Sequence, residues 1–274
     1  MSSLTYAEQM ELAGRLTETI TRQAMEELDL PEESAGLDVG CGNGRHSLWL
    51  AEAIGNGGKV VGLDISLDNL AAARDRVGRS GLSGGIELIR GDLLNLPFKN
   101  GSFHWIWCAD TLWTGFVTEE PVAVISDLAR IVKPGGVVAL LYWSNQSFLP
   151  GYPALEARLN KAFAETTRYL AGIPPEQHFL RASGWLKQAG LKKAAARSYV
   201  SGVQAPLSPD TKEALAFCFD MFWGELEEHV SADDWQEFKR ICSPESEDFI
   251  LNDPGYYAFI VYTVFFAHVG AVSG

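Results

Sequence analysis

Short continuous runs of apolar residues alternate with segments of helical spacing along the first half of the chain. The expected strands lie at 36–39, 59–64, 86–90, 102–110 and 137–142, and the expected helices at about 43–54, 66–79 and 119–133. A regular alternation of strand and helix predicts a parallel sheet with helices on both of its faces. The run from Val137 to Tyr142 is apolar throughout, which is typical of a strand buried on both sides.

A further helix is predicted ahead of the first strand, over residues 5–28. Thr5 and Glu8 form a capping-box signature, and apolar residues repeat behind them at helical spacing. Pro31 and the polar residues after it provide the link into the first strand.

Beyond Trp143 the pattern predicts more sheet elements with two helical insertions between them. A crossover helix is expected at 179–190, a sixth strand at 191–200 and a last strand at 256–269, with insertions at about 145–176 and 205–254. A membrane span is the alternative for the last run, but a span needs about 18 or more apolar residues. Thr263 and His268 interrupt this run, so we expect no membrane insertion.

The composition is that of an ordinary globular protein, with 47% hydrophobic and 21% charged residues in a chain of 274. The formal charge of −13 argues against a nucleic acid or an anionic membrane surface as partner, because those partners require Lys and Arg. The second insertion carries much of this charge, since residues 210–253 contain 13 acidic and 3 basic residues, a net −10. Such a run is typical of solvated helix faces.

The cysteines and histidines indicate neither a disulfide framework nor a metal site. The four cysteines are scattered without Cys-x-x-Cys spacing, and the five histidines do not cluster. The first residues also lack the basic and then apolar pattern of a signal peptide, so a cytoplasmic location is expected.

The glycine-rich stretch after the first strand is the strongest chemical signal. It follows the pattern Asp38-x-Gly40-x-Gly42-x-Gly44, between an apolar strand and a helical segment. Glycines at this spacing allow a tight turn and let a ligand lie against bare backbone at a helix N-terminus. The dinucleotide fingerprint G-x-G-x-x-G does not fit, because Arg45 stands where its third glycine would be.

These residues resemble motif I of the class I S-adenosylmethionine-dependent methyltransferases. Later segments resemble the same family in the same order: a second strand that ends in Asp64, a third followed by Gly91 and Asp92, a fourth over 102–110, and the run from Leu128 to Trp143. The resemblance covers about residues 30–145. The stretch from Asn95 to Phe98 and the run from Leu128 to Gly136 are similar to those of quinone-biosynthesis and sterol-type methyltransferases, although many small-molecule relatives share them.

The resemblance implies a Rossmann-like methyltransferase fold, a doubly wound and mostly parallel seven-stranded sheet with helical lid insertions. The expected parts are an N-terminal helix over the cofactor pocket (1–30), a cofactor-binding core (31–145), a helical insertion (146–176), the C-terminal part of the core sheet (177–204 and 255–274) and an acidic helical lid (205–254). Ligands of such sheets bind beyond the carboxyl ends of the strands.

The cofactor implied is S-adenosyl-L-methionine, with S-adenosyl-L-homocysteine as product. Asp64 is expected at the ribose, Ile65 at the adenine face and Asp92 near the adenine amino group. The full expected cofactor set is Asp38, Gly40, Cys41, Gly42, Gly44, Asp64, Ile65, Asp92, Leu93 and Ala109.

The implied reaction is in-line transfer of a methyl group to a small, largely apolar molecule, for which the protein aligns the reactants and excludes water. The sequence names no acceptor and predicts no oligomeric state. Two alternatives stay open: another reaction on the same scaffold, such as decarboxylation or cyclisation, and a non-catalytic binding or regulatory protein.

No Asp-Asn or Asp-Asp pair follows Asp110 as a metal-dependent relative would require. As a general base, His178, Tyr142, Asp110 and His46 are all conceivable.

Aromatic residues at the sheet edge and in the second insertion are the candidate acceptor contacts: Trp113, Tyr142, Trp143, Phe222 and Trp223. They favour an apolar acceptor, because pockets bind through apolar walls with a few placed polar groups. The competing interpretation is that the aromatic residues of the insertion only attach the added helices to the domain.

Overall fold

The computed structural model describes residues 5–114 and 120–270, and every strand expected in the first half of the chain is present. The helices are α1 (Tyr6–Glu26), α2 (Arg45–Ile54), α3 (Leu67–Ser80), α4 (Pro121–Arg130), α5 (Pro153–Thr166), α6 (Ala182–Gln188), α7 (Pro209–Trp223) and α8 (Ala232–Cys242). The strands are β1 (Ala35–Val39), β2 (Lys59–Asp64), β3 (Ile86–Arg90), β4 (Phe103–Ala109), β5 (Val132–Ser147), β6 (Lys192–Gln204) and β7 (Tyr257–His268). Short 3₁₀ helices occur at Ser83–Gly85, Pro175–Gln177, Phe179–Arg181, Glu227–His229 and Ile250–Asn252.

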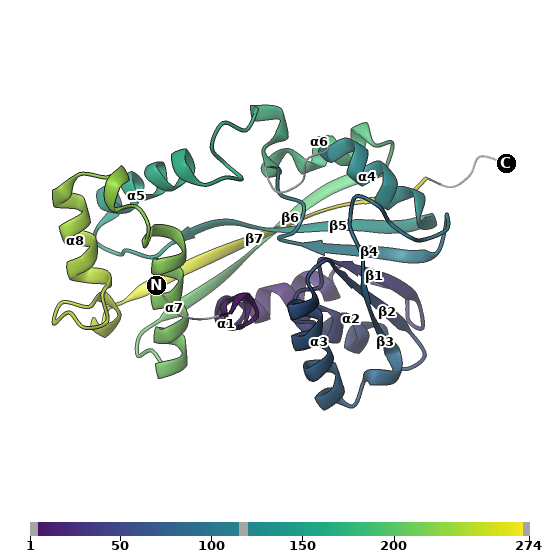
Figure 1. Ribbon diagram of the computed structural model, residues 1–274, viewed down its shortest axis with the longest axis horizontal. Coiled ribbons are helices and arrows are strands. Elements are labelled where there is room, and N and C mark those ends of the chain that lie inside the picture. Colours follow the sequence, from purple (N-terminus) through teal and green to yellow (C-terminus); the bar gives the residue numbers. More distant parts are fainter. Residues whose placement is uncertain (1–4, 115–119, 271–274) are drawn as a thin grey trace.

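The strands form one seven-stranded sheet in the order β3-β2-β1-β4-β5-β7-β6. The first five strands pair in parallel, whereas β7 runs antiparallel between β5 and β6. Helices α1, α2 and α3 lie on one face, and α4 and α6 on the other (Figure 1). The doubly wound fold and the antiparallel last strand are therefore confirmed.

Strand β5 is much longer than the expected 137–142. It begins at Val132, where it pairs with Phe103, and it continues to Ser147, which pairs with Phe259 of β7. The added segments of β5, 132–136 and 143–147, are largely polar or contain Pro and Gly, so the apolar pattern of the sequence does not predict them as strand. Pairing with neighbouring strands supplies the hydrogen bonds that keep them extended.

Three helix boundaries also differ from expectation. The helix expected over 119–133 is α4. It ends at Arg130, because the chain then pairs with β4 as the start of β5. The expected start at residue 119 lies outside the described residues. Helix α5 occupies only Pro153–Thr166 of the helical insertion expected at 145–176. Helix α1 ends at Glu26 and begins with the predicted capping box, whose Thr5 and Glu8 contacts are both present.

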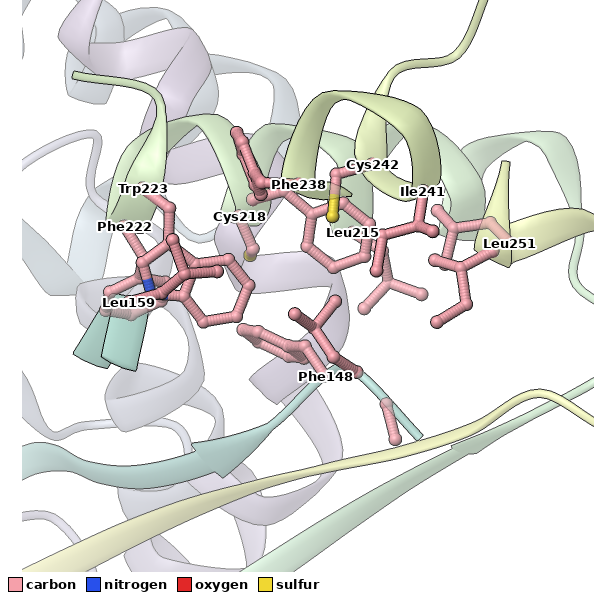
Figure 2. Close-up of a cluster of buried hydrophobic side chains, with 14 of the residues drawn as sticks. Phe148, Leu159, Leu215, Cys218, Phe222, Trp223, Phe238, Ile241, Cys242 and Leu251 are labelled. Carbon is pink, nitrogen blue, oxygen red and sulfur yellow. The ribbon is translucent and has the colours of Figure 1, made fainter. Parts of the chain in front are cut away.

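Helices α5, α7 and α8 gather beyond the carboxyl end of β5, at the end of the molecule opposite α2 and α3 (Figure 1). We call these three helices the helical module. Its core, shown in Figure 2, is dense with large side chains, among them Phe148, Leu159, Phe219 and Trp223. Leu16 of α1 belongs to the same cluster, so the N-terminal helix is also packed against the module.

Candidate functional site

The glycine loop between β1 and α2 has the backbone that its sequence requires. Gly40, Gly42 and Gly44 all have positive φ, at 69°, 53° and 75°. A Cβ on Gly44 would lie 2.9 Å from the Cβ of Ala73, so this glycine lets α2 start close against α3. A Cβ on Gly40 would overlap with Oγ1 of Thr111, the second residue after β4. The loop thus requires glycine for both conformation and space.

Two carboxylates fix this loop to the neighbouring strands. Oδ2 of Asp64, at the end of β2, accepts a hydrogen bond from the backbone N–H of Gly42 at 2.9 Å. Its Oδ1 accepts from the N–H of Ser66 at 2.8 Å, and the Asn69 amide contacts both oxygens. Asp64 is 8% exposed, so it is a preorganised hydrogen-bond acceptor at the strand end.

Asp38 lies deeper, at 1% exposure, and accepts a hydrogen bond from Oγ of Ser47 at 2.6 Å. Burial raises the pKa of Asp38 to about 7, against the hydrogen bond from Ser47, and the charge of Asp64 raises it further. Cys41 is also buried, and its N–H donates to the carbonyl of Leu63 at 3.0 Å. The two carboxylates therefore place hydrogen-bond acceptors next to the glycine loop and behind it.

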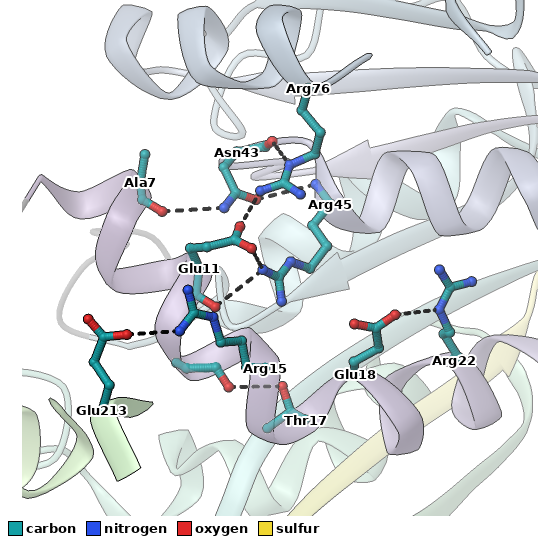
Figure 3. Close-up of polar contacts among 11 residues, drawn as sticks. Ala7, Glu11, Arg15, Thr17, Glu18, Arg22, Asn43, Arg45, Arg76 and Glu213 are labelled. Carbon is teal, nitrogen blue, oxygen red and sulfur yellow. Dashed lines mark hydrogen bonds and ion pairs between the residues drawn. The ribbon is translucent and has the colours of Figure 1, made fainter. Parts of the chain in front are cut away.

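Helix α1 covers the glycine loop and is fixed there by charged groups (Figure 3). Glu11 forms ion pairs with both Arg45 of α2 and Arg76 of α3. Arg76 also donates to the carbonyl of Asn43 at 3.0 Å, and the Asn43 amide donates to the carbonyl of Ala7 at 3.3 Å. These contacts join α1 to both helices that frame the loop.

The approach of α1 is close enough to place a side chain over the loop. Sδ of Met10 lies 2.7 Å from where a Cβ of Gly42 would be, and Nη1 of Arg45 fills the corresponding space at Gly14. None of these contacts was predicted from the sequence, because only the fold brings the partners together.

The remaining expected cofactor residues lie at the ends of β2, β3 and β4. Ile65 is 62% exposed directly after Asp64, and Asp92 is exposed with Oδ1 accepting from the N–H of Leu94 at 2.9 Å. Leu93 and Ala109 are partly buried. The N–H of Gly91 donates to the carbonyl of Asp64 at 3.1 Å, which brings the β2 and β3 ends together. The expected set therefore converges on one edge of the sheet.

Asp110 follows β4 at the same edge, with a φ of 46° that is uncommon for a residue other than glycine. Its Oδ1 accepts from the N–H of Trp143 at 2.9 Å, and its Oδ2 accepts from the hydroxyl of Tyr262 at 2.8 Å. The other three candidate bases make different contacts. Tyr142 is buried and donates to the carbonyl of Leu112, Nδ1 of His46 accepts from the Trp107 indole, and Nδ1 of His178 accepts from the N–H of Leu180.

Burial lowers the pKa of His46 to about 3, with the charge of Arg45 adding to the effect, so this imidazole is neutral at physiological pH. Burial raises the pKa of Asp110 to about 6, although both of its hydrogen bonds act against the shift. Asp110 is thus ionised near neutral pH and still basic for a carboxylate.

A series of aromatic ring contacts runs from Trp113, after β4, along the core of the helical module to Trp143 of β5. Successive ring centroids are 4.9 Å apart for Trp113 and Tyr169, 6.2 Å for Tyr169 and Phe163, 5.2 Å for Phe163 and Phe222, and 5.5 Å for Phe222 and Trp143. We call these five residues the aromatic arc. All are partly buried except Phe222, which is 9% exposed.

The expected acceptor contacts divide between this arc and the core. Trp113, Trp143 and Phe222 are in the arc. Tyr142 is 1% exposed, and Trp223 is fully buried with its indole N–H donating to Oδ1 of Asn160 at 3.0 Å. Tyr169 and Phe163 were not predicted from the sequence as acceptor contacts.

Neither a metal centre nor a membrane span is found among the described residues. Residues 5–114 and 120–270 contain no group of three or more His, Cys, Asp or Glu arranged to hold a metal ion. Within those ranges no helix is both long and apolar enough to cross a membrane.

Comparisons with known proteins agree on one class of enzyme. The family model described as "Methyltransferase domain" matches residues 37–136. The demethylmenaquinone methyltransferase of Lysinibacillus sphaericus is 30% identical over 194 residues, which is 66% of this chain and 80% of that protein. The methyltransferase GfsG of Streptomyces halstedii is 34% identical over 123 residues, and the match spans 45% of this chain and 42% of GfsG.

A solved structure shows the same fold. The S-adenosylmethionine-dependent methyltransferase of Aquifex aeolicus superposes with a TM-score of 0.51 at 22% identity, over 72% of this chain and 92% of that one.

Proposed function

The chain belongs to the class I S-adenosylmethionine-dependent methyltransferases, and we propose that it methylates a small, flat and mostly apolar molecule bound against the aromatic arc. S-adenosylmethionine is its cofactor, and it supplies an electrophilic methyl group on a sulfonium. The single observation that carries the proposed acceptor is the position of the arc, beside the edge where the glycine loop, Asp64 and Ala109 meet.

The residues present fit this cofactor. The positive φ of Gly40 and Gly42 leaves bare backbone at the start of α2, and the fixed carboxylate of Asp64 suits a pair of ribose hydroxyls. Ile65, which is 62% exposed beside Asp64, offers an apolar surface for adenine. Asp38, buried behind the loop, favours the cationic amino group of the methionine moiety.

The arc supports an aromatic acceptor over a charged or polymeric one. Offset or edge-on aromatic contacts with centroids about 4.5–7 Å apart contribute about 0.5–1.5 kcal/mol beyond burial, so five rings would select a flat molecule. The net charge of −13 also disfavours nucleic acids. The demethylmenaquinone methyltransferases act, by their name, on a quinone, and a reduced naphthoquinone is accordingly the acceptor class to test first.

The test is methyl transfer from S-adenosylmethionine with a deuterated methyl group, followed by mass spectrometry. Reduced short-chain demethylmenaquinone is the probe, and an aliphatic amine of similar size is the comparison. We expect a labelled product from the quinol only, and its loss in Phe222→Ala with cofactor affinity retained. Transfer to the amine alone would exclude the aromatic acceptor.

A further inference from the structure

Asp110 joins the end of β4 to β5 and β7 through its carboxylate, and it adopts an unusual backbone conformation to do so. It adopts a left-handed φ of 46°, which Asp and Asn tolerate better than most residues but which still costs energy. The strand could end at Ala109 without it. The left-handed turn accompanies a carboxylate that contacts two paired residues inside β5 and β7, Trp143 and Tyr262.

Asp110 is linked to the glycine loop through its neighbour Thr111 and to the aromatic arc through Trp143. Thr111, the next residue, lies against Gly40 of the loop, and Trp143 and Trp113 belong to the aromatic arc. Among the described residues, the hydrogen bonds to Asp110 go one to each oxygen, from Trp143 and Tyr262. An ionised carboxylate has about four acceptor sites, so lone pairs remain on both oxygens.

We propose that Asp110 takes the proton of the methyl acceptor during transfer and that Tyr262 positions its carboxylate. The inference rests on the proposed function and adds that the acceptor presents an O–H or N–H group. In the step, that X–H bond breaks and its proton passes to Asp110 while an X lone pair forms the bond to the methyl carbon. The carbon–sulfur bond breaks with its electron pair left on sulfur, and Asp110 later releases the proton to water.

The electrostatic surroundings suit this role. Within residues 5–114 and 120–270, the titratable groups that interact with Asp110 include Tyr262, Tyr142, Tyr169 and Cys108. Burial raises the pKa of each of them, so all four are neutral at pH 7 and none of the four compensates the Asp110 charge. A general base is most effective when its pKa is near the working pH, and burial raises the pKa of Asp110 to about 6.

The probe for a direct test is 2-naphthol, added to the protein saturated with S-adenosylhomocysteine. Excited naphthol is a strong acid, and in a dry site it emits as naphtholate only when a base beside it accepts the proton. Fluorescence anisotropy reports whether the naphthol binds, and the emission spectrum reports proton transfer. The pH is varied from about 4.5 to 8 around the pKa of Asp110.

Wild type should bind naphthol and emit as naphtholate, with a midpoint near pH 6. Asp110→Asn keeps a side chain that tolerates the left-handed backbone, and it should bind naphthol equally but emit only from the neutral form. Tyr262→Phe removes a hydrogen bond that lowers the pKa of Asp110, so the midpoint should move to higher pH. Asp75→Asn, an exposed change on α3, should match wild type.

Two results would overturn the inference, and they are distinguishable. Naphthol that binds and gives the same emission in wild type and Asp110→Asn leaves the aromatic acceptor site standing but removes Asp110 as proton acceptor. Naphthol that does not bind contradicts the proposed acceptor surface itself, and the inference falls with it. A midpoint unchanged in Tyr262→Phe would remove the positioning role of Tyr262.

Discussion

Replacing Asp38 with Asn should change how the stability of the cofactor-free protein depends on pH. Asp38 is 1% exposed, and its chief polar partner is the Ser47 hydroxyl at 2.6 Å. Burial, reinforced by the charge of Asp64, raises its pKa from 3.8 to about 7 in the folded protein. The unfolded chain exposes Asp38 to water and restores the ordinary value.

The sign of the effect follows from proton counting. Between pH 3.8 and about 7 the folded state retains the Asp38 proton while the unfolded state has released it. The free energy of unfolding therefore falls as pH rises, by about 1.36 kcal/mol per pH unit. Over the whole interval the loss is about 4 kcal/mol, and it is constant at higher pH. The Asn side chain of the variant cannot ionise, so the variant lacks this loss.

Urea unfolding of both proteins between pH 4 and 8, without cofactor, measures the difference. The stability of Asp38→Asn relative to wild type should increase by about 4 kcal/mol across this range. The Asn amide makes different hydrogen bonds from the Asp38 carboxyl, and this difference shifts the free energy of unfolding by an amount that does not vary with pH. Asp75→Asn, an exposed change, should show no such trend. If the stability of Asp38→Asn relative to wild type did not change with pH, the raised pKa of Asp38 would be refuted.

Three more predictions address the two halves of the site. Asp64→Ala should weaken S-adenosylmethionine binding at least about tenfold in calorimetry, because charge-assisted hydrogen bonds contribute about 1.5–3 kcal/mol each. Asp68→Ala, an exposed change, is the control, and an affinity of Asp64→Ala within threefold of this control would contradict the prediction. Gly42→Val should fold, by circular dichroism, yet lose cofactor binding, since its φ is 53° and its space is filled; retained binding would show that the loop does not approach the ligand. Trp223→Ala and Phe222→Ala should both lower the free energy of unfolding by about 3–5 kcal/mol, because both side chains are buried in the module core. Only Phe222→Ala should also raise the acceptor KM, and an unchanged KM in this variant would remove Phe222 from the acceptor surface.

The elements that the sequence predicted are those whose determinants are local. The capping box of Thr5 and Glu8 lies within one helical turn, and the glycine loop within seven residues. Alternating apolar runs imply a parallel sheet because its strands are buried on both faces. The carboxyl ends of such strands share an edge, so the sequence alone is enough to expect Asp64 and Asp92 near one another.

The unpredicted parts depend on partners that are distant in the chain. The last residues of β5 are polar, and they are extended because β7 supplies their hydrogen bonds, with Oγ of Ser144 and Oγ1 of Thr263 2.8 Å apart. Tyr262 lies 152 residues beyond Asp110 in an apolar strand, where nothing distinguishes its hydroxyl from that of a core tyrosine. Sequence spacing carries no information about such pairs.

Helix α1 connects the two halves of the site. Met10 lies over Gly42 and Glu11 pairs with Arg45, so the first part of the helix packs against the glycine loop. Leu16 packs into the core of the helical module, and Arg15 pairs with Glu213 of α7 at 3.0 Å. A helix is stiff over this length, so a movement of α1 that changes access to the glycine loop also changes its packing against the module. Cofactor and acceptor binding are therefore expected to be energetically coupled, and each should tighten the other if both favour the docked helix.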